Sequence, residues 1–330
     1  HGTVTVMQQE TAYEVTTFRT ESGYQDFRRP DHVTFVRSLR EDLKRRDFTI
    51  NALALQHDGT IIDLFAGLTD LENKVIRAVG DPNERFHEDA LRMMRAVRFE
   101  SQLGFTIEAN TEVAIRAQHQ LLSKIAVERI HDEFVKLMLG QARYNGLVSF
   151  VQTELYQQCP DFTNAGPAFK ALLKLPTTPL RSEAAVWLLI AQQLQLDSEQ
   201  VKPFLRHWKS ANDLIHAVST SLPVLQKFLA QQPLSNWDFY QAGLTNVLTA
   251  NQIAYFYGAD VAETALQSKY QQLPIKQRSE LAVNGGDLLQ ALALKPGPKL
   301  GQLLAHLERA VVAAQIPNQK AALIAAATKL

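Results

Sequence analysis

The chain has 330 residues, of which 34 are basic and 34 are acidic, so its formal net charge at pH 7 is zero. This length allows more than one folded module, because single hydrophobic cores rarely grow beyond about 250 to 300 residues, and the balanced charge offers no electrostatic sign of a nucleic-acid partner. The single cysteine, Cys159, excludes an internal disulfide and a multi-cysteine zinc site and fits a cytoplasmic location, and no apolar run approaches the roughly 20 residues that a membrane-spanning helix needs.

Strand signals dominate the first 66 residues, where β-branched and aromatic residues gather in short runs. These runs lie at 2–7, 13–18, 49–55 and 60–64. The chain opens at His1, without a methionine, and enters the first run at once, so we expect a natural N-terminal segment to precede it. This part of the sequence predicts a small, incomplete mixed β-sheet.

Helical periodicity begins near Asp70 and continues to the end of the chain, with prolines that mark helix starts and breaks. Gly140 is typical of a helix end, and the stretch from Pro274 to Asn284 is typical of a linker. The sequence therefore predicts an α+β fold in which a small sheet is followed by helices only. We expect four segments, at 1–66, 67–140, 141–274 and 275–330.

Charged side chains cluster at residues 45–52, just before or inside a predicted strand. Arg45 and Arg46 carry guanidinium forks that match phosphate oxygens, and Asp47 beside them can accept a ribose hydroxyl. This combination suits a nucleotide. The alternative is an exposed charged turn that leads into a strand.

A second charged cluster begins at Glu88 and Asp89 and continues with Arg92, Arg95 and Arg98 in a segment predicted to be helical. Glu88 and Arg92 could simply form a surface ion pair, because residues four apart are neighbours on a helix. From Asp89 to Arg98, however, the row advances by three residues, or about 4.5 Å, per step. Such a row could follow an extended ligand from its base to its terminal phosphate.

The pair Asp89 and Arg92 makes a specific hypothesis about the base possible. Cytosine and adenine both present an amino group beside a ring-nitrogen acceptor, whereas uracil and guanine present a carbonyl beside a ring N–H. A carboxylate that accepts from the amino group and an arginine that donates to the ring nitrogen would bind C and A and reject U and G. Rejection should be strong, because the wrong base leaves a buried charged group unpaired.

Three further acidic and basic residues allow two interpretations each. Glu14, in a predicted strand, could be a third carboxylate beside a metal pair or could point outward from a half-buried strand. Arg129 and Glu133 lie four residues apart on a predicted helix, and we expect them to brace helices rather than to touch a substrate. No pair of histidines has the spacing of a metal site, and we assign the histidines no role.

In series, these motifs resemble those of the class II tRNA nucleotidyltransferases. The matching stretches are Glu14 to Arg19, Glu41 to Ala52, Gly80-Asp81-Pro82, Glu88-Asp89-x-x-Arg92 and Arg129 to Glu133. The stretches 283–288 and 295–298 resemble the tail of bacterial CCA-adding members, which weighs against the related bacterial poly(A) polymerases. The resemblance covers nearly the whole chain and is weakest from about 145 to 270.

The resemblance implies a nucleotidyltransferase head at 1–66, a helical neck at 67–140 that recognises the base, a body at 141–274 and a tRNA-binding tail at 275–330. It implies addition of CCA to tRNA 3' ends from CTP and ATP, with Mg²⁺ as cofactor and release of pyrophosphate. The implied nucleotide-binding residues are Arg46, Asp89, Arg92, Arg95 and Arg98, assisted by Arg45, Asp47 and Glu88. Bacterial members are often dimers, which leaves a homodimer open.

One family motif is absent from these 330 residues: a Gly-Gly turn followed by Arg-Asp and an Asp-x-Asp pair that holds the metal. We expect that motif to precede His1, so that these residues alone bind nucleotide with little or no transfer. Two alternatives stay open. One is a poly(A) polymerase or an enzyme that adds only CC or only A, and the other is a non-catalytic nucleotide or tRNA binder.

Overall fold

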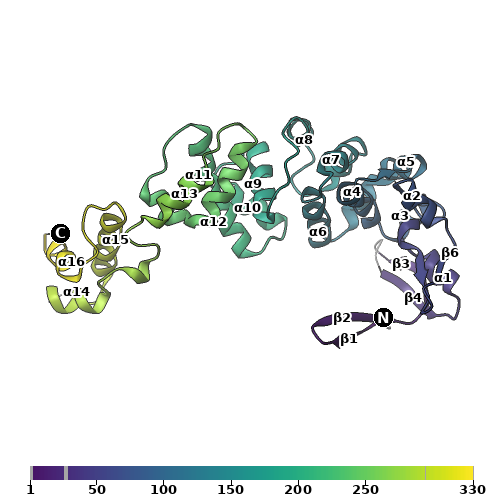
Figure 1. Cartoon of the computed structure of the whole chain (residues 1–330), viewed down its shortest axis with the longest axis horizontal. Helices are drawn as coiled ribbons and strands as arrows, with labels where there is room; N and C mark the ends of the chain where they lie inside the picture. The colour runs from purple at the N-terminus through teal and green to yellow at the C-terminus, as the bar shows by residue number, and fades with distance from the viewer. Residues whose placement is uncertain (1–2, 26–28, 294, 330) are drawn as a thin grey trace. The chain divides into compact units, whose positions relative to one another are not determined.

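The computed structural model describes residues 3–25, 29–293 and 295–329 (Figure 1). The chain divides into two compact units. The first comprises His1–Val186 and Phe204–Ser210, and the second comprises Trp187–Pro203 and Ala211–Leu330. The described residues fold into short strands followed by many helices, so the predicted α+β class is confirmed. The boundaries predicted at 66, 140 and 275 stay predictions.

The strands of the first unit pair two by two. The antiparallel pairs are β1 (Thr3–Gln8) with β2 (Thr11–Thr16), β3 (Arg19–Gln25) with β4 (Arg29–Phe35) and β5 (Leu53–Leu55) with β6 (Ile61–Asp63), and the parallel pair is β7 (Val75–Ile76) with β8 (Thr106–Ile107). Within the described residues these pairs form four separate two-stranded sheets, whereas the sequence predicted one mixed sheet. Every residue of the hairpin β1–β2 is exposed, including Val4 and its cross-strand partner Val15.

The strand predicted at 49–55 is wrong in its first half. Thr49–Asn51 forms the 3-10 turn η1, and only Leu53–Leu55 is extended. The reason is local, because the carboxylate of Asp47 accepts hydrogen bonds from the backbone N–H of Phe48 and from the side chain of Asn51. A side chain that bonds to its own neighbourhood in this way competes with extended pairing.

Eight α-helices of the described residues lie wholly within the first unit. They are α1 (Leu39–Lys44), α2 (Gly67–Glu72), α3 (Pro82–Glu88), α4 (Leu91–Leu103), α5 (Ala109–Gln118), α6 (Val127–Met138), α7 (Arg143–Gln152) and α8 (Gly166–Leu172). The start of α3 is fixed by sequence, because Asp81 accepts from the N–H of Asn83 and Pro82 occupies the first turn. The predicted run of helices from Asp70 is therefore confirmed, apart from the two-residue strands β7 and β8.

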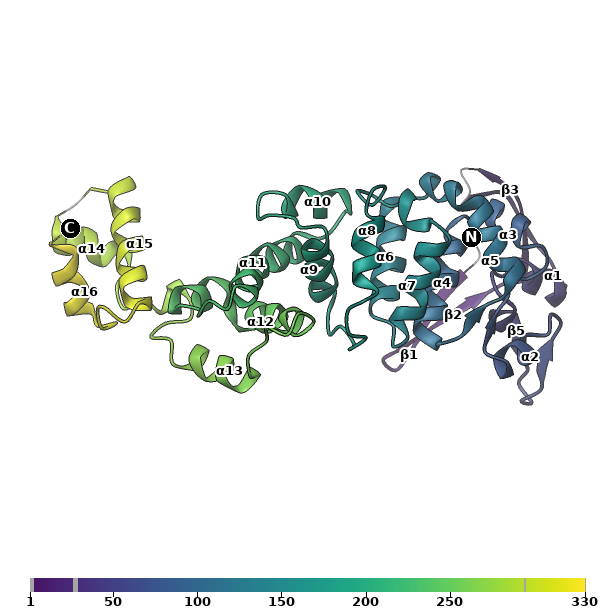
Figure 2. The same cartoon turned by 90° about the horizontal axis from the view of Figure 1, so that it is seen from above.

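Helix α4 lies at the centre of this unit, side by side with α6 and α7 (Figure 2). It buries Met93, Met94, Ala96 and Val97 completely. The close approach of α7 requires glycine, because a Cβ atom on Gly146 would lie 2.6 Å from the Cβ of Ser101. Large aromatic side chains pack against one another and complete this core. They are Phe134, Phe150, Phe162, Phe169 and Trp208.

The second unit consists of helices. Helices α9 (Glu183–Gln193) and α10 (Val201–His207) each have residues in both units. They are followed by α11 (Asn212–Leu229), α12 (Asn236–Tyr255) and α13 (Glu263–Gln271). Ser235 and Asp238 form a capping box at the start of α12. The last three helices, α14 (Gly285–Leu292), α15 (Pro298–Val312) and α16 (Lys320–Ala327), share a core that includes Leu288, Leu307 and Leu323.

Candidate functional site

A polar cavity of about 630 Å³ lies in the first unit. Three segments form it: the stretch from Arg45 to Asn51, the junction of α3 and α4 with the first three turns of α4, and one face of α6. The lining residues are Arg45, Arg46, Asp47, Asn51, Asp89, Leu91, Arg92, Arg95, Phe99, Arg129, Asp132, Glu133 and Lys136. The two charged clusters predicted from the sequence thus meet in one place.

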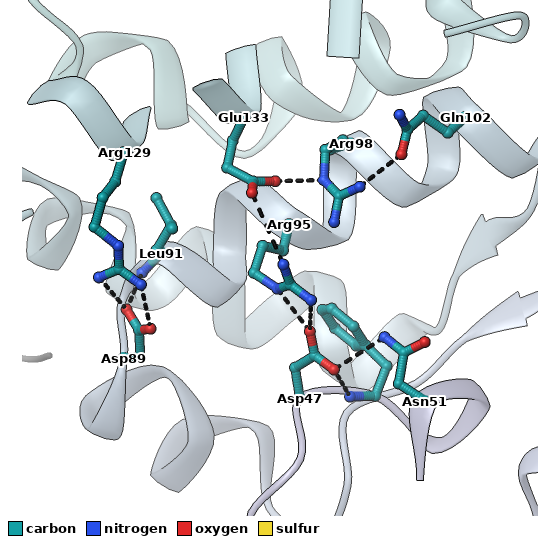
Figure 3. A network of polar contacts seen from close by, with 10 residues as sticks. Asp47, Asn51, Asp89, Leu91, Arg95, Arg98, Gln102, Arg129 and Glu133 are labelled. Carbon is teal, nitrogen blue, oxygen red and sulfur yellow. Dashed lines mark hydrogen bonds and ion pairs between the residues drawn. The ribbon is translucent and has the colours of Figure 1, made fainter. Parts of the chain in front are cut away.

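Asp47 joins the first segment to α4 (Figure 3). Its Oδ1 atom accepts from the N–H of Phe48 at 2.9 Å and from Asn51 Nδ2 at 3.0 Å, and its Oδ2 atom accepts from Arg95 Nε at 2.7 Å. Burial by itself would raise the pKa of Asp47, but the charge of Arg95 and these hydrogen bonds outweigh burial and lower the pKa below its ordinary value. Asp47 is therefore an ionised carboxylate whose two oxygens are both held.

Arg45 and Arg46 are held from behind by Asp42, a buried residue of α1. Arg45 donates to Asp42 Oδ1 from Nε at 3.0 Å and from Nη2 at 2.9 Å, while Arg46 Nη2 lies 3.6 Å from Oδ2. Arg46 is the looser of the two, with 41 % of its side chain exposed. It can therefore swing toward an anion in the cavity at small cost.

Asp89 is not part of helix α4, which corrects the predicted single helix through Glu88 and Arg98. Helix α3 ends at Glu88, α4 begins at Leu91, and Asp89 between them has extended backbone angles of φ −143° and ψ 102°. Its Oδ1 atom accepts from the N–H of Leu91 at 3.1 Å. Arg129 of α6 donates to both oxygens, with 3.2 Å from Nη1 to Oδ1 and 2.8 Å from Nη2 to Oδ2 (Figure 3).

Arg92 is buried, and backbone and side-chain acceptors fix its plane. Nη1 donates to Glu88 Oε2 at 2.7 Å and to the carbonyl of Arg85 at 3.2 Å, and Nη2 donates to the carbonyl of Arg45 at 2.7 Å. A guanidinium group has five N–H bonds, so three are used in these contacts. The remaining two are available for a ligand in the cavity that Arg92 lines.

Arg95 and Arg98 share Glu133 of α6 (Figure 3). Arg95 Nη1 lies 3.8 Å from Glu133 Oε1, and Arg98 Nε donates to Glu133 Oε2 in a very short contact. Arg98 also donates to Gln102 at 2.6 Å and lies over the ring of Phe99, with 3.9 Å between the guanidinium carbon and the ring centroid. Arg98 therefore supports the wall of the cavity from behind and does not line it.

Some predicted site residues lie away from the cavity lining. Glu88 and Arg98 stand behind it in the ion pairs just described, and Glu14 lies on β2 of the exposed hairpin β1–β2. The helical period explains Arg98, because six residues beyond Arg92 a side chain points about 120° away around the helix. The predicted nucleotide contacts of Glu88 and Arg98, and the predicted role of Glu14 as a third carboxylate beside a metal pair, stay predictions.

Other lining residues were missed by the sequence reasoning. Arg129 and Glu133 were expected to brace helices, and they do form ion pairs, yet both also line the cavity. Asp132 and Lys136 of the same helix line it too. Residues spaced by three, four and seven lie on one face of a helix, so this spacing could have revealed the whole set.

The family's metal site is not found among the residues that the structure describes, since none of them forms a group of three or more His, Cys, Asp or Glu side chains that could hold a metal ion. The cavity residues do not fit a metal centre, because three of the four lining carboxylates, Asp47, Asp89 and Glu133, are each paired with an arginine, and Asp132 alone is too few ligands. In residues 3–25, 29–293 and 295–329, no helix has the length and apolar character needed to cross a bilayer.

Models of three protein families match successive parts of the chain. The poly A polymerase head domain matches residues 1–77, the probable RNA and SrmB-binding site of polymerase A matches 104–165, and a putative tRNA nucleotidyltransferase domain 2 matches 178–327. The CCA-adding enzyme of Latilactobacillus sakei is 54% identical over 99% of this chain and 82% of the relative. The chain belongs to the CCA-adding enzymes. Another member, from Limosilactobacillus fermentum, is 52% identical over 100% of this chain and 82% of its own length.

Solved structures of CCA-adding enzymes share the fold. The Bacillus stearothermophilus CCA-adding enzyme in complex with CTP is 36% identical, with a TM-score of 0.86 over 100% of this chain and 81% of that chain. The Thermotoga maritima CCA-adding enzyme complexed with tRNA is 22% identical, with a TM-score of 0.55 over 87% of this chain and 73% of that chain, and supports the fold alone. Nucleotidyltransferases of this family generally use a divalent metal ion.

Proposed function

We propose that this chain is a tRNA nucleotidyltransferase that adds CCA to tRNA 3' ends from CTP and ATP and releases pyrophosphate. The observation that carries the proposal is the presence of Asp89 and Arg92 on one cavity wall, each fixed by other residues and each with hydrogen-bonding capacity to spare. The 36% identical structure of similar fold is a complex with CTP, which supports a nucleotide in this cavity.

The base would be recognised by one acceptor and one donor. Asp89 Oδ1 accepts from Arg129 and from the N–H of Leu91, while Oδ2 accepts one hydrogen bond from Arg129 and can accept another. The N–H groups that Arg92 does not use in its contacts can donate to the ring nitrogen. Cytosine and adenine fit this pair, while uracil and guanine would place a carbonyl against Asp89 and an N–H against Arg92.

The phosphates and the ribose would lie toward Arg46 and Arg95. Arg46 is held loosely and carries the charge that a triphosphate needs, and Arg45 lies beside it. Arg95 can pass from Asp47 to a ribose or phosphate oxygen without leaving the cavity wall. Asp47, with Asn51, would then receive a sugar hydroxyl.

The reaction would be in-line attack of the tRNA 3' hydroxyl on the α-phosphate of the bound nucleotide, with pyrophosphate as the leaving group. We propose Mg²⁺ as the divalent ion and assign no cavity residue to it, because three of the four lining carboxylates, Asp47, Asp89 and Glu133, are paired with arginines. The tail, α14 to α16, is proposed to bind tRNA. A tRNA substrate and a single buried cysteine both suit action in the cytoplasm.

The test is calorimetric binding of CTP, ATP, UTP and GTP to the 330-residue chain. We expect CTP and ATP to bind at least about tenfold more tightly than UTP and GTP, because a mismatched buried charge costs more than about 1.4 kcal/mol. Equal binding of all four nucleotides would contradict base recognition by Asp89 and Arg92. With tRNA that ends before its CCA, we expect little or no incorporation by these residues alone. Labelled products extended by C, C and A would support CCA addition directly, and runs of A alone would favour a poly(A) polymerase.

A further inference from the structure

Arg85 of α3 is a buried arginine outside the cavity lining. It is only 7% exposed, and its Nη2 atom lies 2.5 Å from Glu88 Oε1, a distance typical of a tight ion pair. Its Nη1 atom donates to the carbonyl of Lys44 at 3.1 Å. Arg85 therefore ties α3 to the end of α1.

Arg92 makes the same kind of contacts, but with the carbonyl of the next residue, Arg45, in place of that of Lys44. The other oxygen of Glu88, Oε2, accepts from Arg92 Nη1 at 2.7 Å, and Arg92 Nη2 donates to the carbonyl of Arg45 at 2.7 Å. One carboxylate thus holds two buried arginines, which donate to two successive carbonyls. The carbonyl of Arg85 closes the network by accepting from Arg92 Nη1.

The two carbonyls belong to the end of a helix. Helix α1 ends at Lys44, with Arg45 as its C-cap. The last carbonyls of a helix have no intrahelical partner and carry partial negative charge, so they are natural acceptors for cations. The residues that follow at once are Arg46 and Asp47, which line the cavity. The Arg85–Glu88–Arg92 network therefore sets the distance between the first segment of the cavity and the side chain of Arg92.

We propose that Arg85 is a positioning residue for base discrimination, acting through Glu88 on Arg92. The proposal rests on the proposed function, because it assumes that Arg92 donates to the base. If Arg85 is removed, Glu88 Oε1 loses its ion-pair partner. With Oε1 free, both oxygens of Glu88 could pair with the two terminal nitrogens of Arg92, because arginine favours two-point pairing with a carboxylate. Arg92 would then turn its second nitrogen toward Glu88, away from the carbonyl of Arg45 and from the ligand.

The test compares Arg85→Met with wild type by the ratio of the Kd values for UTP and CTP. We expect this ratio to fall by about tenfold, the change that corresponds to one lost charge-assisted hydrogen bond. The affinity for UTP should stay within about twofold, because Arg85 does not line the cavity and UTP gains nothing from Arg92. Arg116→Met, on the exposed surface of α5, is the matched control and should leave the ratio unchanged.

Two further variants separate positioning from folding. Arg85→Lys keeps one charged donor for Glu88 and should recover part of the ratio. In the Glu88→Gln background, Arg85→Met should cause no additional loss, because both changes act on the same contact. Circular dichroism and melting temperature show whether each variant is folded.

The outcomes distinguish this inference from the proposed function. A wild-type chain that prefers CTP together with a folded Arg85→Met variant of unchanged ratio would overturn the role of Arg85 and leave the function standing. An equal loss of affinity for all four nucleotides in that variant would overturn it as well. A wild-type chain without any preference would contradict the proposed base recognition itself, and the role of Arg85 with it.

Discussion

Asp89 and Arg129 form a two-point ion pair in the wall of the cavity, with Arg129 Nη2 at 2.8 Å from Asp89 Oδ2 and Nη1 at 3.2 Å from Oδ1. Asp89 lies in the break between α3 and α4, where no helix fixes its side chain. The guanidinium plane of Arg129 therefore sets the plane of the carboxylate, together with the N–H of Leu91. These contacts leave one lone pair, on Asp89 Oδ2, that can accept from a base.

Replacing Asp89 or Arg92 with alanine should relax or abolish discrimination between CTP and UTP. Each substitution removes one partner of the proposed base pairing, and a lost hydrogen bond to a charged group costs about 1.5 to 3 kcal/mol, or about tenfold to a hundredfold in binding. The measurement is the ratio of Kd values for the two nucleotides by calorimetry. Glu128→Ala, exposed in the first turn of α6, is a control that should keep the wild-type ratio. Wild-type preference for CTP in both cavity variants would eliminate this assignment.

Part of the cavity lining could be predicted from the sequence, because several of its members are motif residues of defined chemistry. Arg45, Arg46, Asp47, Asp89, Arg92 and Arg95 were all predicted, and all line one cavity. Their mutual pairing was not predictable. Asp47 lies 48 residues from Arg95, and Asp89 lies 40 residues from Arg129, so these pairings depend on how distant segments meet. Only the ion pair of Glu88 with Arg92, four residues away, could be considered from spacing.

In the fold as well, features set by neighbouring residues were predicted better than features set by contacts between distant segments. Helices were predicted well because their period, caps and prolines are local signals, as at Asp81 and Pro82. Among the strands that were missed, β3 and β4 have sequences that are mostly polar and lack an apolar alternation. Residues 49–51 were predicted as strand from Thr49 and Ile50, but the contacts of Asp47 with Phe48 and Asn51 turn the chain there.

Replacing Arg129 with methionine should weaken binding of CTP and ATP by about threefold to tenfold. This change corresponds to a loss of roughly 0.7 to 1.4 kcal/mol of binding free energy. Asp89 would keep its charge but lose the partner that orients it. Calorimetry on Arg129→Met, Asp89→Ala and the double variant tests this mechanism. The double variant should bind CTP no more weakly than Asp89→Ala alone, since the two residues act through one contact. Additive losses would mean that Arg129 touches the nucleotide independently of Asp89.

Two glycine-to-alanine substitutions should change stability in opposite directions. At Gly146, a new Cβ atom would lie 2.6 Å from the Cβ of Ser101 and 2.7 Å from the carbonyl oxygen of Val97, so the contact of α7 with α4 must open. We expect Gly146→Ala to destabilise the protein by about 1 to 3 kcal/mol. At Gly301, in the interior of α15, nothing lies within 4 Å of the new atom, and alanine should stabilise by about 0.5 to 1 kcal/mol. Melting temperatures measured by calorimetry should therefore fall for the first variant and rise for the second.

Glu100 of α4 should make stability depend on pH. It is 6% exposed, and its Oε2 atom has no hydrogen-bond partner among the described residues. Burial raises its pKa from 4.5 to about 7, with a smaller contribution from Glu112 and against the hydrogen bonds from Ser149 and Ile107. Between these two pH values the folded protein holds a proton that the unfolded chain has released. Stability therefore falls as pH rises through this window, and the loss is complete above pH 7.

Replacing Glu100 with glutamine removes this penalty, because the amide stays neutral at every pH. We expect Glu100→Gln to be more stable than wild type by about 1 to 3 kcal/mol at pH 8 and nearly equal to it at pH 4.5, where the acid is protonated in the folded protein and still half protonated in the unfolded chain. Melting temperatures of both proteins across this range provide the measurement. Glu128→Gln, whose side chain is exposed on α6, should show no such trend. A difference between Glu100→Gln and wild type that did not grow with pH would mean that Glu100 is ionised in the folded protein, with solvent or a cation reaching Oε2.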